Sequence, residues 1–192
     1  PEVVYDPSGV EAFQSLSAGE TTTDTVTYTI RDSGGAISEK ATIKITVTGT
    51  NDAPVAQPEK YSAFKGAPLE KSDATAGLLA NDTDVDTDAS KLQAAPADGS
   101  APNEDGSFEV ISASGARVTI NQDGSFTYDP TTVAATSIFG ELDEGESSID
   151  TFTYAVIDGQ GGVSTTTAIM EVTGTLDEAP VGLDSLEAVD GP

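Results

Sequence analysis

One segment of this chain occurs twice, and the distance in sequence between the two copies limits what the chain can fold into. Residues 24–35 read DTVTYTIRDSGG, and residues 150–162 read DTFTYAVIDGQGG. Each is followed by a Thr-rich apolar stretch and then by VTGT and Ala-Pro-Val, within residues 47–55 and 172–181. The copies start 126 residues apart (24 to 150), which is the size of an independent domain rather than of a short solenoid unit. We therefore predict a piece of a tandem array.

The local pattern is that of β-strands almost throughout. Apolar residues alternate with Thr or Lys in TFTYAVI and in ATIKITV, which is the period of half-buried antiparallel strands. Asp-Gly turn signals separate these runs. An all-β fold follows, an antiparallel β-sandwich of immunoglobulin or cadherin type, with a closed barrel as the weaker alternative. In the second copy we expect strands near residues 57–64, 90–95, 107–112, 116–120, 125–129, 150–157 and 163–173.

The repeat divides the 192 residues unequally. YDP occurs at 5–7 and again at 128–130, late in the second copy. Residues 1–52 are therefore predicted to be the C-terminal part of one repeat and an incomplete sandwich, which alone would leave strand edges open. We expect this part to be disordered, completed by another chain, or paired with segments outside this sequence. Residues 53–180 are predicted to be a complete repeat, and 181–192 the start of the next repeat or a tail.

Composition excludes several classes of function. The net charge is −25, from 33 acidic and 8 basic residues, so nucleic acid and anionic membrane surfaces are excluded as partners. No run is long and apolar enough for direct membrane insertion. The chain has no Cys and no His, which removes disulfides, thiolate and imidazole metal ligands, and the triads of nucleophilic catalysis. No pair of acids stands out as a glycosidase pair. We expect no enzymatic activity.

The densest acidic segment is NDTDVDTD, residues 81–88. Asp82, Asp84, Asp86 and Asp88 recur at every second position. Hard oxygen ligands at this density suit Ca²⁺, although the glycine and glutamate positions of an EF-hand loop are absent. The alternative is a solvated acidic loop. We favour calcium, because the chain has few cations to neutralise these carboxylates.

Two further features place acids where repeats meet. Asn51 and Asp52 precede Ala-Pro in the first linker, and Asp177 lies in the matching LDEAP segment of the second. Proline stiffens such a linker, and a cation there would fix the angle between domains; an ordinary polar linker is the alternative. Asp158 begins the hairpin DGQGG, and the formation of a turn fully explains the glycines of this hairpin. If the strand after this hairpin ends at the second linker, Asp158 lies near Asp52.

These motifs together resemble a known family. DTFTYAVIDGQGG with VTGT, then NDAPV and LLANDTDVD, is similar to the cadherin-like (VCBS-type) tandem repeats of large bacterial RTX surface adhesins. The resemblance implies sandwich domains with calcium near their junctions. The family pattern matches this sequence in the acidic loop, in the linker and in the hairpins, at Asn81, Asp82, Asp84, Asp86, Asn51, Asp52, Asp32 and Asp158.

Two departures from the family pattern bear on the sites. Thr87 replaces the usual glycine of the acidic loop, and Leu176 with Glu178 surrounds Asp177 at the second junction. We therefore take Asn51, Asp52, Asp82, Asp84, Asp86, Asp158 and Asp177 as candidate Ca²⁺ ligands, the last with least support from the motif.

The expected function is that of a structural extender in a secreted bacterial cell-surface adhesin. Calcium would make the junctions rigid, and the array would support cell adhesion and biofilm formation. The expected partners are neighbouring repeats of the same chain, which hold a distal adhesive module away from the cell. The alternative is a carbohydrate- or protein-binding sandwich module of the same adhesin, which a cluster of exposed aromatic residues would favour.

Overall fold

Two four-stranded sheets pack face to face and make up most of the molecule. The computed structural model describes residues 3–134 and 137–176. The strand orders are β3-β10-β9-β5 in one sheet and β4-β8-β7-β6 in the other. The strands are β3 (Glu59–Phe64), β4 (Leu69–Lys71), β5 (Gln93–Ala95), β6 (Ser107–Ile111), β7 (Arg117–Asn121), β8 (Phe126–Asp129), β9 (Ser147–Ile157) and β10 (Val163–Thr173). The predicted immunoglobulin/cadherin-like β-sandwich is confirmed.

The core lies between the two sheets and comes from the alternation that the sequence shows. Along β10 every second residue is buried from Thr166 to Val172. Phe152 and Tyr154 on β9 meet the inward side chains of β7 and β8. The rings of Phe126 and Phe152 are 5.9 Å apart between centroids, which joins the two sheets through an aromatic contact. Burial of one face of each sheet thus fixes the register of every strand.

Three details differ from the predicted strands. The strand expected at 90–95 begins only at Gln93, because residues 89–91 form a short 3₁₀ helix. β4 was not predicted, because three residues are too short to show an alternation; it pairs with β8 in the second sheet. β3 is not antiparallel to its neighbour but parallel to β10, with Glu59 opposite Ala168. Both strands start at the end where the linker enters and run away from it, so no hairpin can join them. The chain then crosses to the other sheet at β4.

The connections include three short 3₁₀ helices. η1 (Ala74–Ala76) precedes the acidic segment, η2 (Ala89–Lys91) follows it, and η3 (Pro130–Thr132) follows β8. Asp88 caps η2 by accepting the backbone N–H of Ser90. This satisfies a donor that the helix leaves free and gives the last acid of the segment a structural role.

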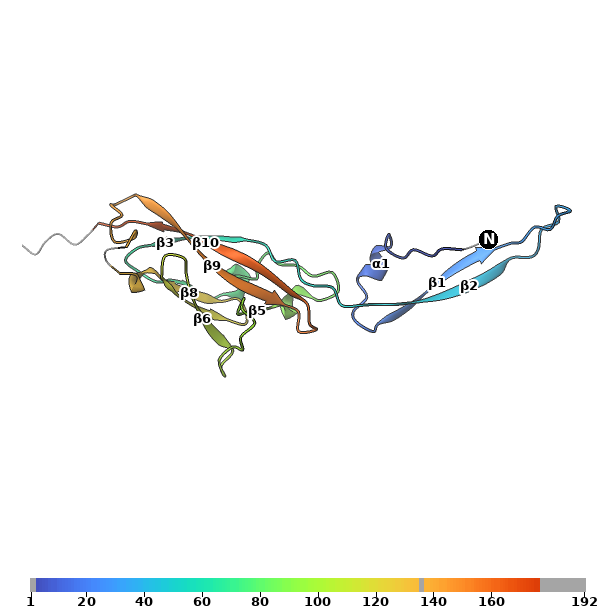
Figure 1. The fold of residues 1–192 in the computed structure, drawn as a ribbon, viewed down its shortest axis with the longest axis horizontal. Helices are drawn as coiled ribbons and strands as arrows, with labels where there is room; N and C mark the ends of the chain where they lie inside the picture. The colour runs from blue at the N-terminus through green and yellow to red at the C-terminus, as the bar shows by residue number, and fades with distance from the viewer. Residues whose placement is uncertain (1–2, 135–136, 177–192) are drawn as a thin grey trace, which may run out of the picture.

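The first copy forms a separate two-stranded sheet. β1 (Thr21–Tyr28) and β2 (Ala41–Thr48) pair antiparallel, preceded by α1 (Glu11–Gln14). Figure 1 shows this hairpin and the sandwich following one another along the long axis, joined by the linker. The expectation of disorder is therefore wrong for residues 21–48, but neither face of the hairpin is covered by a second sheet among the described residues. No described helix is long and apolar enough to cross a membrane.

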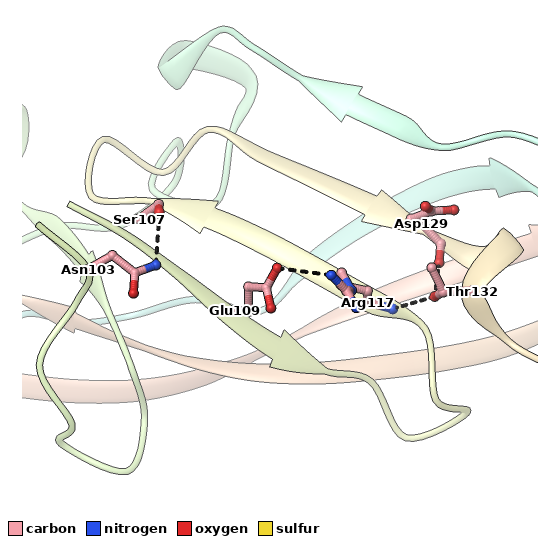
Figure 2. Close-up of polar contacts among 6 residues, drawn as sticks. All are labelled: Asn103, Ser107, Glu109, Arg117, Asp129 and Thr132. Atoms are coloured by element: carbon pink, nitrogen blue, oxygen red, sulfur yellow. Dashed lines mark hydrogen bonds and ion pairs between the residues drawn. The ribbon is translucent and has the colours of Figure 1, made fainter. Parts of the chain in front are cut away.

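Polar contacts occupy the solvent side of the second sheet. Figure 2 shows Glu109 on β6 reaching Arg117 on β7, with 3.4 Å between Oε1 and Nη1. The backbone N–H of Arg117 donates to the hydroxyl of Thr132, which in turn donates to the carbonyl of Asp129. These contacts are local and exposed, and each is worth little stability.

Candidate metal centre at the junction

Three segments distant in sequence meet where the hairpin of the first copy joins the sandwich. They are the linker, the acidic segment and the turn between β9 and β10. Asn51 Nδ2 donates to Asp158 Oδ2 at 2.7 Å, and the backbone N–H of Asp52 donates to Asp86 Oδ2 at 3.4 Å. The inference that Asp158 lies beside the preceding linker is therefore confirmed.

Asp158 is positioned by the glycines of its turn. Its Oδ1 accepts the backbone N–H groups of Gln160, Gly161 and Gly162 at 2.7–3.0 Å. Gly161 has a positive φ, and a Cβ on Gly162 would overlap both Asp158 Oδ2 and the linker backbone. Burial raises the pKa of Asp158, but the bonds from Asn51 and from these backbone groups more than offset it and leave the pKa lowered. The glycines thus allow an ionised carboxylate to sit against the linker.

Asp84 and Asp86 approach the linker from the acidic segment. Asp84 Oδ1 accepts the backbone N–H groups of Asp86 and Thr87, which folds the segment into a tight loop. Burial raises the pKa of Asp86, and its contact with Asp84 raises it further. The carbonyl of Asp86 accepts the hydroxyl of Ser17 from the first copy at 3.0 Å. The loop therefore contacts both sides of the junction.

Asp82 belongs to a different place. Val55 and Thr83 form an antiparallel bridge, so residues before Thr83 lie beside residues after Val55, on the sandwich side of the linker. Asp82 Oδ1 accepts the backbone N–H of Gln57 at 2.8 Å, and the residue is 3 % exposed. The bridge thus separates Asp82 from Asp84 and Asp86, and the every-second-residue pattern does not make one cage.

The structure therefore brings five of the seven predicted residues together. These are Asn51, Asp52, Asp84, Asp86 and Asp158, whereas Asp82 faces inward and Asp177 lies outside the described residues. Sequence reasoning missed Ser17 and Gln160, and it treated Thr87 only as a departure from the family pattern. Gln160 Nε2 donates to Thr87 Oγ1. The repeat could have pointed to Ser17, because SLSAGE at 15–20 matches ELDEGE at 141–146 just before the duplicated strand.

The junction has buried oxygens that could bind a hard cation and that the fold itself does not use. Asn51 Oδ1, Asp84 Oδ2 and Asp86 Oδ1 are buried and have no hydrogen-bond partner. Such atoms cost free energy unless a ligand or water satisfies them. No three acidic side chains among the described residues converge to hold a metal by themselves. A calcium ion here would draw on the Asn51 amide and on main-chain carbonyls as well, both of which are ordinary calcium ligands.

Comparison with known proteins assigns the family. Residues 51–174 match the bacterial cadherin-like domain, which is more than half of the chain. The chain belongs to the bacterial cadherin-like domain family. Its matched region includes the linker, the acidic segment and the hairpin just described. Cadherin-like domains are adhesion-type structural modules of extracellular or surface proteins, and they generally bind Ca²⁺.

Two solved structures are similar only distantly. One is an endo-fucoidan hydrolase of glycoside hydrolase family 107, with 17 % identity and a TM-score of 0.35 over 84 % of this chain and 20 % of that one. The other is a protocadherin gammaB7 EC3-6 cis-dimer structure, with 13 % identity and a TM-score of 0.41 over 91 % of this chain and 35 % of that one. The chain thus spans about a fifth and a third of their lengths. No curated protein matches it.

Proposed function

We propose that this cadherin-like chain is a structural extender of a secreted bacterial cell-surface adhesin of the RTX type. In this proposal calcium binds at the junction and makes successive repeats rigid. The array then holds a distal adhesive module away from the cell and supports adhesion and biofilm formation. The module itself performs no reaction.

The observation that carries the proposal is the set of unpartnered oxygens on Asn51, Asp84 and Asp86 at the junction. Asn51 belongs to the linker, and the two aspartates belong to the sandwich, whose loop also contacts Ser17. A cation bound to all three would cross-link the linker to the sandwich. It would also neutralise part of the net charge of −25, which otherwise favours extended and mobile linkers.

The residues at the junction have different roles in the proposed site. Asp158 orients Asn51 through its hydrogen bond, and three backbone N–H groups hold Asp158 ionised. Asp84 shapes the acidic loop with one oxygen and leaves the other available. When calcium is bound, it would supply the electrostatic bond between these groups. At a calcium concentration 100 times the dissociation constant, one site stabilises the folded state by about 2.7 kcal/mol.

Amide hydrogen exchange on peptides covering residues 47–56 tests the proposal locally. Calcium should slow exchange in the wild-type linker relative to chelator, because the linker opens less often. The variant Asp84→Asn/Asp86→Asn keeps the shape of both side chains and should lose this protection. Glu104→Gln removes a charge from an exposed turn and should behave as wild type. Equal linker exchange with calcium and with chelator would refute calcium-dependent stiffening.

The alternative, a ligand-binding module, has weaker support. A groove of about 470 Å³ lies between the loop 96–103 and β6. Its one aromatic lining residue, Phe108, is 4 % exposed and belongs to the core. The groove therefore offers no stacking surface for a sugar ring. Binding of this chain on a glycan array would favour the alternative.

A further inference from the structure

The chain enters and leaves the sandwich through two neighbouring strands. The first linker leads into β3, and β10 leads out toward the second linker. β3 lies at the edge of its sheet, beside β10. The two strands pair over six residues each, from Glu59 opposite Ala168 to Phe64 opposite Thr173. Tension along an array of repeats would therefore enter the folded sandwich on one strand of this ladder and leave it on the other.

The parallel direction of the pair decides how such tension acts. The start of β3 lies at the junction end of the ladder, and the end of β10 lies at the opposite end. Figure 1 shows both strands running along the long axis that joins the hairpin of the first copy to the sandwich. A pull on the two linkers is thus directed along the strands and would slide one past the other. The bonds of a parallel ladder are evenly spaced, so sliding loads them together rather than one after another.

Backbone contacts outside β3 fasten this strand to the sandwich at both of its ends. On the junction side, Val55 and Thr83 exchange backbone hydrogen bonds of 2.7 and 3.3 Å. On the far side, the backbone N–H of Lys65 donates to the carbonyl of Thr173 on β10 at 3.0 Å. Sliding of β3 must therefore break bonds before its first residue and after its last one.

Side chains oppose the same sliding motion. Ala63 on β3 is buried in the core, and the ring of Tyr61 meets that of Phe126 on β8 edge-on, with 4.9 Å between centroids. Movement of β3 along β10 would pull both side chains out of their packing against the second sheet. The ion pair between Lys60 and Glu171 also spans the two strands, but both side chains are exposed and the pair adds little.

β10 is held more firmly than β3. It pairs with β9 over eleven residues, from Val163 to Thr173, in addition to its pairing with β3. Among the described strands, β3 pairs with β10 alone. The ladder between β3 and β10 is therefore the contact that yields first when the two linkers are pulled apart.

We propose that the β3–β10 ladder is a mechanical clamp, loaded in shear, that lets the sandwich carry tension along the array without unfolding. The inference rests on the proposed role as an extender, because only a chain held at both ends bears tension. It does not rest on calcium. The five residues that meet at the junction lie outside both strands, and they are Asn51, Asp52, Asp84, Asp86 and Asp158.

The hairpin of the first copy is loaded in a different way. Among the described strands, β2 pairs with β1 alone. Thr21, the first residue of β1, is opposite Thr48, the last residue of β2. The chain thus enters and leaves this hairpin at the same end, so a pull opens it one bond at a time. The two copies should differ in their resistance to force although they share the duplicated segment.

Single-molecule pulling of the full chain tests the clamp by changing only the direction of the load. The chain has no cysteine, so Thr50→Cys or Gly66→Cys provides one attachment point, and the C-terminal end of the chain provides the other. Thr50 is exposed, and a Cβ on Gly66 would lie 3.5 Å from Thr175 Oγ1, which is ordinary van der Waals contact. From position 50 the force enters at the start of β3 and shears the ladder. From position 66 it enters just after β3, beside the end of β10, and peels the two strands apart.

The unfolding force should be several-fold higher from position 50 than from position 66, with calcium and with chelator alike. Forced unfolding follows the unfolding rate along the pulled direction, so two variants with the same melting temperature should still differ. Equal forces from the two positions would overturn the clamp, and so would a difference that appears only with calcium. The linker exchange experiment does not depend on the direction of a load, so the two proposals fail separately.

Pulling the unmodified chain by its two ends gives the comparison between the copies. Residues 21–48 should unravel first, at low force, and the sandwich should follow at a force several-fold higher. Each residue released adds about 3.3–3.6 Å of length, which identifies the two events. Release of the sandwich at the same force as the hairpin would also overturn the clamp.

Discussion

The two copies of the repeat make the same contact at the start of the duplicated segment. Tyr5 donates to Asp24 at 2.9 Å in the first copy, and Tyr128 donates to Asp150 at 2.7 Å in the second. In the first copy both residues are half-buried, whereas in the second both are buried. Asp150 also accepts the backbone N–H of Ser114, which comes from the turn between β6 and β7. The same Tyr–Asp contact thus forms in both copies, and in the second copy it joins β8 of one sheet to β9 of the other and is buried between them.

The turn that precedes the duplicated strand also has the same hydrogen bond in both copies. Gly49 donates to the carbonyl of Glu20, and Gly174 donates to that of Glu146, both at 2.8 Å. A Cβ on either glycine would overlap backbone carbonyl oxygens. The same loop therefore forms with or without a complete sandwich. What the first copy lacks in the described residues is the cover over its strands.

The two copies should differ most at the tyrosine that both carry in the same strand position. Tyr154 is 0 % exposed and donates to the carbonyl of Leu78, whereas Tyr28 is 46 % exposed. Tyr154→Ala should lower the free energy of unfolding of the sandwich by about 3–5 kcal/mol. Tyr28→Ala should change it by less than about 0.5 kcal/mol. Chemical denaturation measures both, and similar losses would mean that the first copy is packed as well as the second.

A smaller effect is expected at the Tyr–Asp pair. Tyr128→Phe removes one hydroxyl and leaves a buried Asp150 oxygen without its donor, which should cost about 1–3 kcal/mol. Tyr5→Phe exposes the same oxygen of Asp24 to water and should cost less than about 0.5 kcal/mol. Melting temperatures of the two variants check the difference. An equal loss in both would contradict the claim that burial separates the copies.

The smallest expected effect is on the stability of the protein at acid pH. The folded pKa of Asp158 is lowered, so its contribution to stability is present above the unfolded pKa, about 3.9, and is lost as pH falls through the folded pKa. Asp32, in the matching hairpin, accepts from the backbone N–H of Ala36 in its own turn, and no linker side chain among the described residues donates to it. A melting curve from pH 6 to pH 2 should be flatter in Asp158→Asn than in wild type. Identical curves would mean that the ionised Asp158 carboxylate, with its bonds from Asn51 and from the turn, contributes no stability.

Most of the sandwich could be predicted because its strands bury one face. The alternation in β9 and β10, together with the Asp-Gly turns before β6 and between β7 and β8, predicts those strands. β4 could not be predicted, since three residues carry no period. The parallel pairing of β3 with β10 depends on where the linker enters the sandwich. No local sequence pattern predicts that position.

The candidate site was predictable only in part. The repeat and the turn chemistry place Asp158 beside the linker, and the structure agrees. The acidic segment was misleading, because four aspartates at equal spacing take three roles: Asp82 faces inward, Asp84 and Asp86 face the junction, and Asp88 caps η2. The bridge between Val55 and Thr83 separates them, and this contact is long-range.

Calcium is proposed to stiffen the junction between the two copies. Small-angle X-ray scattering with calcium and with chelator tests it most directly, with Asp84→Asn/Asp86→Asn as the comparison. Calcium should narrow the distribution of interatomic distances and extend its maximum in wild type, and the variant should show neither change. A wild-type profile that is the same with calcium and with chelator would contradict it.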